Sequence, residues 1–172
     1  MSKELIFEGR KIKLFLVEER LPNGRSAKRE VVEHPGAVVV LPVFDDGRVL
    51  LEDHYRFAVG GNLIEAVAGT LEPGEDPGEC AKRELLEETG YTASEWVHLG
   101  SFYSSPGVMT ELMHAFLAQK LTRGERRLED DEILEPLEVP LEEALNWART
   151  GKIRDAKTIS TLFLALGHLG RK

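Results

Sequence analysis

The chain has 172 residues, of which 42% are hydrophobic and 30% are charged, and its formal net charge at pH 7 is −8. This length suits one compact domain with a buried core. An acidic chain lacks the basic surface that sequence-independent binding of nucleic acid requires, so that class of partner is disfavoured. No apolar run approaches the roughly 20 residues of a membrane-spanning helix, and the first residues lack the apolar stretch of a secretory signal.

The single cysteine, Cys80, excludes an intrachain disulfide, so we expect a cytoplasmic protein. The acidic charge and the lack of a long apolar run lead us to expect neither nucleic acid nor a membrane as a partner. Cys80 itself is expected to be a small core residue, because no activating group is evident near it. The histidines lack the spacing of metal ligands and are expected to be structural: His34, His54, His98, His114 and His168.

Residues 1–35 predict a small N-terminal antiparallel β hairpin. Residues 4–17 mix apolar and charged positions as strands do, and a second strand is expected through residues 30–32. Asn23-Gly24 between them is typical of a tight turn. A hairpin of this size is marginally stable alone and needs a surface to pack against.

Residues 36–172 predict a second unit that contains a β-sheet. Residues 37–43 form a continuous apolar run, typical of a strand buried on both faces. The Asp46-Gly47 turn leads to a returning strand that begins at residue 49. Further strands are expected near residues 63–68, 97–103 and 112–118.

Helix-terminal residues predict three helices. Asp76 followed by Pro77 indicates the start of the first, and Gly90 its end. A second is expected over residues 140–151, and Asp155 is expected to cap a last helix that ends near residue 169. Strands, an inserted helix and terminal helices indicate an α+β fold with a mixed β-sheet. The expected apolar face of the last helix comprises Ile159, Leu162, Phe163 and Leu166.

The first helix carries three glutamates on one side. At about 100° per residue, Glu84, Glu87 and Glu88 share a face. Like charges so placed repel by about 0.2–0.5 kcal/mol per pair, and a divalent cation, which prefers carboxylate oxygens, would relieve that repulsion. A solvated acidic face is the alternative. Arg83 is expected either to pair with Glu87 or to hold a loop carboxylate.

The segment GTLEPGEDPGECAKRELLEETGY resembles the signature of the Nudix hydrolases. In that pattern a glycine and a glutamate precede Arg-Glu-aliphatic, which is followed by X-Glu-Glu-X-Gly and an aliphatic residue. Only the last position differs, since Tyr91 stands there, and its large apolar ring is expected to keep the packing role. The matched residues are Gly69, Glu75, Arg83, Glu84, Leu85, Glu87, Glu88 and Gly90.

This resemblance implies a Nudix α/β/α sandwich with a mixed sheet and a catalytic Mg²⁺ site, with Mn²⁺ as an alternative metal. The implied metal ligands are Glu84 and Glu88, with Glu87 assisting and the backbone carbonyl of Ala68 completing the set. Arg83 and Glu87 are also counted as catalytic residues on this basis.

Pro106, which lies 16 residues after Gly90, resembles the mark of the ADP-ribose pyrophosphatase branch of the family. That resemblance implies Mg²⁺-dependent hydrolysis of ADP-ribose to AMP and ribose 5-phosphate. It also implies substrate-binding roles for Arg56, Glu65 and Glu111, although for Arg56 alone a surface salt bridge is equally consistent.

The acidic segment at residues 128–132 would by itself be interpreted as an exposed loop. The branch resemblance implies that a glutamate here acts as the general base. Glu132 matches best, and Asp130 and Asp131 are alternatives.

The resemblance further implies a homodimer, since N-terminal sheets in these enzymes commonly exchange between subunits. A hairpin folded onto its own domain is the alternative. Two other functions stay open. One is a pyrophosphatase for another nucleotide sugar such as GDP-mannose, since residues 108–111 differ in detail from the expected pattern. The other is a non-catalytic nucleotide-sensing module, which the retained glutamates of the helix disfavour.

Overall fold

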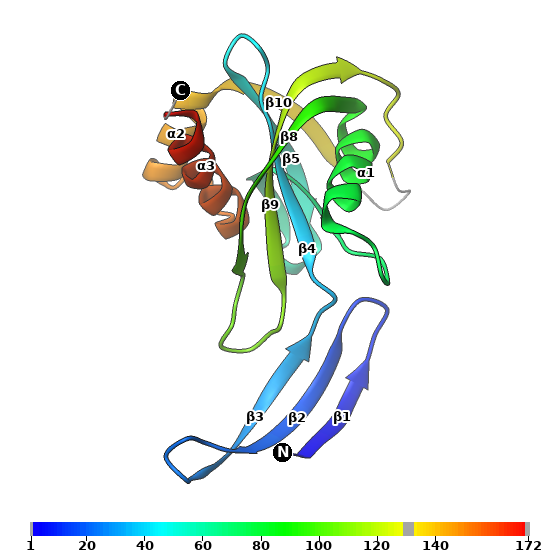
Figure 1. The fold of residues 1–172 in the computed structure, drawn as a ribbon, viewed down its shortest axis with the longest axis vertical. Coiled ribbons are helices and arrows are strands. Elements are labelled where there is room, and N and C mark those ends of the chain that lie inside the picture. Colours follow the sequence, from blue (N-terminus) through cyan, green and yellow to red (C-terminus); the bar gives the residue numbers. More distant parts are fainter. Residues whose placement is uncertain (1, 129–132, 171–172) are drawn as a thin grey trace.

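The structure, a computed structural model, describes residues 2–128 and 133–170. The molecule is elongated, with a small N-terminal sheet at one end and a larger body of strands and helices at the other (Figure 1). Parallel and antiparallel strand pairs both occur in the body, so the predicted α+β fold with a mixed sheet is confirmed.

The N-terminal sheet has three antiparallel strands in the order β1 (Ser2–Glu8), β2 (Lys13–Arg20) and β3 (Ser26–Glu33). The predicted turn around Asn23-Gly24 joins β2 to β3, with Gly24 in the left-handed region at φ 80°. The segment expected to be one strand over residues 4–17 is two strands, because the chain turns where the N–H of Gly9 donates to the carbonyl of Ile12 (2.8 Å). The predicted hairpin is therefore the β2–β3 pair of a three-stranded sheet.

This sheet is tied to the body by β3. The N–H of Val32 donates to the carbonyl of Val108 (2.8 Å), and the N–H of Thr110 donates to the carbonyl of Val32 (2.9 Å). Every residue of β1 is exposed, and among residues 2–33 Val17 alone is buried. The sheet thus has little core of its own. A division of the chain at residues 35 and 36 stays a prediction.

The body contains two further sheets. One has the order β7 (Val67–Thr70), β4 (Ala37–Pro42), β9 (Leu112–Arg123) and β8 (Tyr91–Tyr103). The other has the order β10 (Leu134–Pro140), β5 (Arg48–Arg56) and β6 (Gly61–Glu65), and a short 3-10 helix, η1 (Phe57–Val59), follows β5. Strand β4 is buried along its whole length, as predicted. The strand expected near residues 63–68 is divided at Ala66 between β6 and β7, which belong to different sheets.

Three helices complete the body: α1 (Pro77–Thr89), α2 (Leu141–Thr150) and α3 (Ala156–Leu169). The predicted ends of α1 are confirmed, since the Asp76 side chain accepts hydrogen bonds from two backbone N–H groups of the first turn and Gly90 adopts φ 74°. The expected face of α3 was wrong at Phe163, which is 43% exposed, because the buried face centres on Thr158, Thr161, Leu162 and Ala165.

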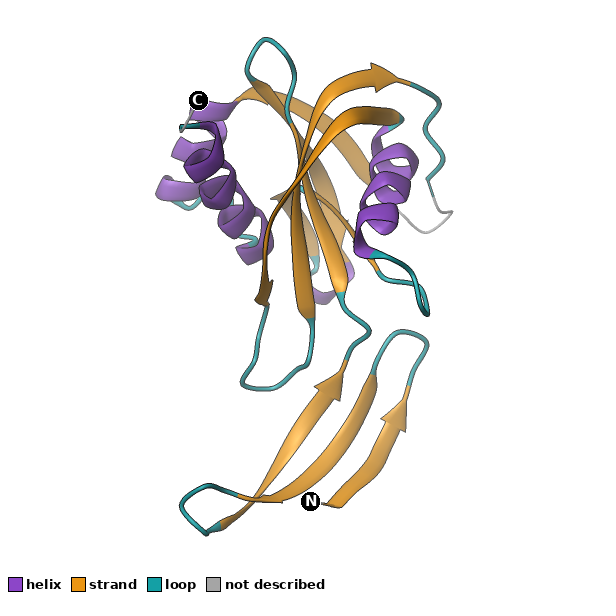
Figure 2. Cartoon of the chain, viewed as in Figure 1, coloured by secondary structure: helices purple, strands orange, loops and turns teal. Residues whose placement is uncertain are grey.

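Helix α1 lies on one side of the strands, and α2 and α3 lie on the other (Figure 2). Alternate residues of β4 enter different cores: Val38 and Val40 pack with Cys80 of α1, whereas Val39 and Leu41 pack with residues of α2 and α3. The expected α/β/α sandwich is therefore confirmed. Cys80 is fully buried, and this burial raises the pKa of its thiol to about 12, in agreement with a structural role. No described helix has the length and apolarity needed to cross a membrane.

Candidate functional site

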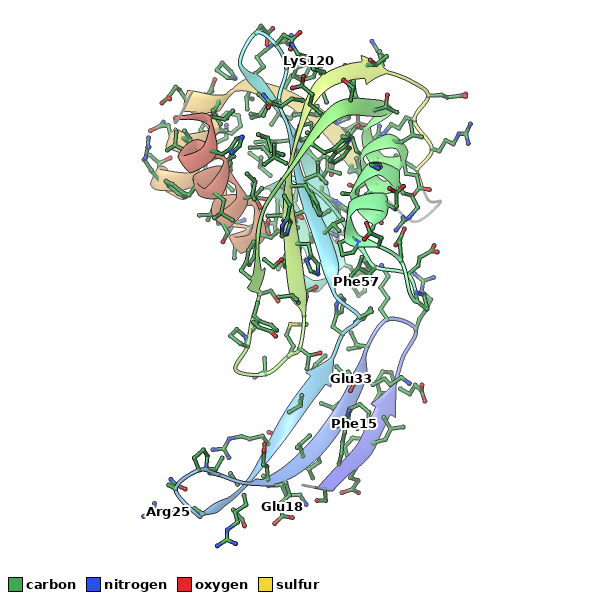
Figure 3. The ribbon with its side chains drawn as sticks, viewed as in Figure 1. Phe15, Glu18, Arg25, Glu33, Phe57 and Lys120 are labelled. Carbon is green, nitrogen blue, oxygen red and sulfur yellow. The ribbon has the colours of Figure 1, made fainter. Side chains whose placement is uncertain are left out.

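A cavity of about 900 Å³ opens where the N-terminal sheet meets the body. Glu33, at the end of β3, lies at this junction (Figure 3). Both signs of charge line the cavity, so it is suited to a ligand that carries anionic groups together with cations. The basic residues are Arg10, Lys11, Lys13, Arg56, Arg83 and Lys157, and the acidic ones are Glu33, Glu72, Glu84, Glu87, Glu88, Glu111 and Asp155.

The glycine that opens the motif makes room for one of its glutamates. A Cβ atom added to Gly69 would lie 1.8 Å from both Cδ and Oε1 of Glu84. The Glu84 carboxylate is thus pressed against the backbone of β7, beside Ala68, at a distance that any larger residue would prevent. This contact explains physically why glycine stands at this position of the motif.

Arg83 connects three carboxylates. Its guanidinium binds Glu75 through Nε and Nη2 (2.9 and 3.1 Å) and also contacts Glu84 (2.7 Å) and Glu87 (3.1 Å) through Nη1. Both roles expected for Arg83 are therefore present together. The hydrogen bonds from Arg83 lower the pKa of Glu75 to about 2, and the carboxylates in turn raise the pKa of Arg83. Arg83 thereby fixes the positions of two predicted metal-site glutamates.

Glu88 points inward and is only 2% exposed. Its Oε2 accepts a hydrogen bond from the N–H of Ala68 (3.1 Å). The four residues expected at the metal site, Ala68, Glu84, Glu87 and Glu88, all line the same cavity. Carboxylate and carbonyl oxygens are the donors that Mg²⁺ and Mn²⁺ favour, so the residues present fit such an ion.

Arg56 also lines the cavity and is held by Glu65. The guanidinium donates from Nε and Nη2 to the two oxygens of this carboxylate (2.9 and 2.6 Å). Lys157 binds the same carboxylate and also contacts Asp155 (3.0 Å). Burial favours the neutral acid, but the bonds from Arg56 and the charge of Lys157 outweigh it and lower the pKa of the Glu65 carboxyl.

Glu65 is 1% exposed and is not among the residues that line the cavity. Its position is that of a residue that orients Arg56, and a direct contact with substrate stays a prediction. Lys157, by contrast, lines the cavity and was missed by sequence reasoning, because a lysine two residues beyond the Asp155 cap carries no distinctive signal.

Glu111 lines the cavity, and Nδ1 of His34 lies 3.5 Å from its Oε1. Burial lowers the pKa of His34. The expected general base, Glu132, and its alternatives Asp130 and Asp131 lie outside the described residues, so this assignment stays a prediction.

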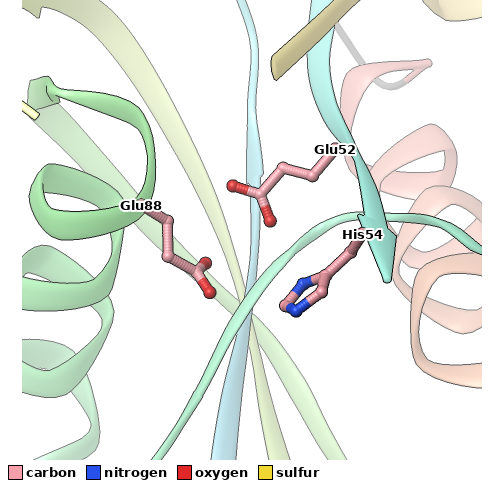
Figure 4. Close-up of side chains that lie close together, drawn as sticks. All are labelled: Glu52, His54 and Glu88. Atoms are coloured by element: carbon pink, nitrogen blue, oxygen red, sulfur yellow. The ribbon is translucent and has the colours of Figure 1, made fainter. Parts of the chain in front are cut away.

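A group that was not anticipated lies behind the cavity. Glu52 and His54 of β5 face Glu88 of α1, and one potential ligand atom from each lies within 4.8 Å of the others (Figure 4). Among the residues described, this is the one set of three such side chains close enough to hold a metal ion. Burial and the charge of Arg56 lower the pKa of His54 to about 4. His54 had been expected to be structural.

Comparison with known proteins identifies the family. A NUDIX domain model matches residues 33–162. The chain is 44% identical over 160 residues to the ADP-ribose pyrophosphatase of Bacillus subtilis (strain 168), with 92% of this chain and 86% of that protein covered. It is 40% identical over 161 residues to the methanol dehydrogenase activator of Bacillus methanolicus, with 92% and 87% covered.

A GDP-mannose pyrophosphatase of Salmonella arizonae is 39% identical over 155 residues, with 83% of this chain and 80% of that protein covered. A crystal structure described as an ADP compounds hydrolase shares the fold with a TM-score of 0.85 at 24% identity, with 100% of this chain and 95% of that one covered. The motif, the sandwich fold and these matches agree, and the chain belongs to the Nudix family.

Proposed function

We propose that this protein hydrolyses the diphosphate linkage of ADP-ribose to AMP and ribose 5-phosphate with the help of Mg²⁺. The observation that carries the proposal is the division of charge in one cavity, which the motif glutamates of α1 line together with Arg56 of β5 and Lys157 of α3. The first group suits a divalent cation, and the second suits phosphate oxygens. The similarity to the Bacillus subtilis ADP-ribose pyrophosphatase supports this substrate.

Ala68, Glu84, Glu87 and Glu88 are the residues that would hold Mg²⁺. When bound, Mg²⁺ supplies charge neutralisation of the diphosphate and polarisation of the attacking water. Arg83 keeps Glu84 and Glu87 in place, so these carboxylates are positioned before the ion arrives. An acidic helix without a cation would repel the substrate, so turnover depends on the metal.

Arg56 is assigned to the diphosphate. Its planar guanidinium suits two phosphate oxygens at once, and the bidentate bond to Glu65 holds its plane in one orientation. Lys157 adds a second positive charge close to the same place. Both groups stabilise the negative charge that the oxygens of the diphosphate carry during the reaction.

Glu132 is proposed as the group that accepts the proton of the attacking water. Glu132→Gln is expected to lower kcat by about 10²–10⁴-fold with little change in substrate affinity. A loss of affinity without a loss of kcat would exclude Glu132 as the base, with Asp130 and Asp131 as the next positions to substitute.

The second candidate substrate is GDP-mannose, favoured by the relatives named GDP-mannose pyrophosphatase. The test compares kcat/KM for the two compounds with purified protein and Mg²⁺. A larger value for ADP-ribose supports the proposal, and a larger value for GDP-mannose overturns the substrate assignment. Binding of either compound without any product would indicate a nucleotide-sensing module instead.

A homodimer formed through residues 1–35 is part of the proposal. Strand β1 and the turn after it expose large apolar side chains, and Phe7 is 56% exposed. Exposed apolar groups gathered on a sheet with little core are typical of an interface between chains. The exposed apolar residues are Leu5, Ile6, Phe7 and Ile12.

A single buried cysteine is compatible with a reducing compartment, and we assign the enzyme to the cytoplasm.

A further inference from the structure

Glu52, His54 and Glu88 form a buried group contributed by two elements that lie far apart in sequence. Glu52 is 1% exposed, His54 6% and Glu88 2%. Figure 4 shows the three side chains turned toward one another from β5 and α1. Two carboxylates this close repel strongly where water is scarce, and a cation between them is the simplest arrangement that removes the repulsion.

The histidine supplies the observation that distinguishes this group from an acidic cluster. His54 is more than nine-tenths buried, and its Nδ1 has no hydrogen-bond partner among the described residues. A buried ring nitrogen without a partner is costly in a folded protein, unless another ligand satisfies it. The ring faces the two carboxylates, so a ligand there would contact a nitrogen and oxygens together.

The distances suit a small ion after a modest adjustment. Bonds of about 2.1 Å in tetrahedral geometry separate ligand atoms by about 3.4 Å. The present separations are within 4.8 Å, so the ligand atoms would have to approach one another by at most about 1.4 Å. Glu88 also lines the cavity, so an ion reaches the group from there without passing through the core.

The donor set points to the class of metal. An imidazole nitrogen with two carboxylates suits Zn²⁺ and neighbouring transition metals, whereas Mg²⁺ prefers oxygen donors and keeps several waters that a buried site has little room for. We propose that Glu52, His54 and Glu88 form a second metal site, which prefers Zn²⁺ to Mg²⁺ and shares Glu88 with the site for Mg²⁺. This inference depends on the proposed function only for the role of Glu88 toward Mg²⁺.

The direct test is X-ray absorption at the zinc edge. The full chain is loaded with one equivalent of Zn²⁺ in excess Mg²⁺. One imidazole nitrogen is expected in the zinc coordination shell of the wild type. An oxygen-only shell would overturn the proposal, and this result needs no variant to be interpreted.

Calorimetric titration with Zn²⁺ in excess Mg²⁺ then assigns the residues. His54→Gln and Glu52→Gln are each expected to weaken binding at least about tenfold, with loss of the nitrogen signal in His54→Gln. His98→Gln is the matched control, because His98 is exposed and lies outside the group, so it should bind Zn²⁺ like the wild type. Circular dichroism checks that each variant folds.

Unchanged Zn²⁺ affinity in both folded variants would contradict the site. Because these measurements record metal binding and not turnover, their failure would leave the proposed hydrolysis of ADP-ribose unaffected. Conversely, a protein that bound Zn²⁺ as expected and released no AMP would refute the proposed function alone.

Discussion

Two arginine–carboxylate arrangements border the cavity, and they differ in charge balance. Around Arg83, one guanidinium faces three carboxylates, those of Glu75, Glu84 and Glu87. Around Glu65, one carboxylate binds two cations, Arg56 and Lys157, and Asp155 brings this second group to neutrality. The first arrangement keeps net negative charge, which suits a metal ion, whereas the second is neutral overall and places two cationic groups, Arg56 and Lys157, on the cavity, where they suit an anionic ligand.

Under the proposed function, this difference lets one cavity bind both halves of a metal–diphosphate pair. Each set of charges is held by internal hydrogen bonds, so little reorganisation is required when the ligand arrives.

Neutralising a metal-site carboxylate should have the largest effect. Glu84→Gln and Glu88→Gln are each expected to lower kcat at least about a hundredfold while the protein still folds, because a ligand for the cation is lost. AMP release in Mg²⁺ measures this. Glu79→Gln is the control, since Glu79 lies on the same helix but is exposed and pairs with Lys82. Near-normal turnover in both site variants would remove the proposed metal site.

Gly69→Ala should cause the second largest loss of activity. The added methyl group would overlap the Glu84 carboxylate, and a displacement of about 1 Å can cost roughly a hundredfold in rate. The effect should appear in kcat. Gly167→Ala serves as the comparison, because a Cβ atom there meets nothing within 4 Å. Equal activity of the two variants would show that the close contact of Glu84 with β7 is unimportant.

Glu65→Gln perturbs the cationic arrangement. The substitution removes the negative charge with which Arg56 and Lys157 pair. We therefore expect a raised KM for ADP-ribose and a loss of about 3 kcal/mol in the free energy of unfolding. Urea denaturation and steady-state kinetics report the two effects separately. Glu138→Gln, which alters an exposed ion pair with Arg48, should change neither by much. A stable Glu65→Gln protein with an unchanged KM would contradict the orienting role of Glu65.

The smallest effect concerns acid stability. The pKa of Glu75 falls from 4.5 to about 2 on folding, so its contribution to stability is complete above pH 4.5 and is lost as the pH drops toward 2. Glu75→Gln should therefore lose less stability than the wild type over that interval. Unfolding curves at pH 6 and pH 3 test this, and parallel losses in both proteins would show that Arg83 does not stabilise the ionised form.

The sequence predicted those features that depend on local signals. Asp76 and Gly90 mark the ends of α1 by chemistry that acts over a few residues, and the motif placed Glu84, Glu87 and Glu88 on one helix. The turn at Gly9 was missed because apolar and charged residues alternate in the same manner on both sides of it. Strand β10 was missed because its pairing with β5 joins distant segments.

The deeper part of the site depends on such long-range pairing as well. Glu52 and His54 look like ordinary strand residues until β5 is set opposite the end of α1, where Glu88 lies. Lys157 enters the cavity because α3 begins beside the end of β6, so that it reaches Glu65. Spacing along the chain reports neither arrangement, since both are products of the tertiary fold.

The most direct test of the account is AMP release from ADP-ribose with Mg²⁺ and with a chelator, for the wild type and Glu84→Gln in parallel. Rapid release by the wild type only with Mg²⁺, and a large loss in Glu84→Gln, is the predicted result. AMP release that continues in the presence of the chelator, or that is unchanged by Glu84→Gln, would contradict the division of charge on which the proposed function rests.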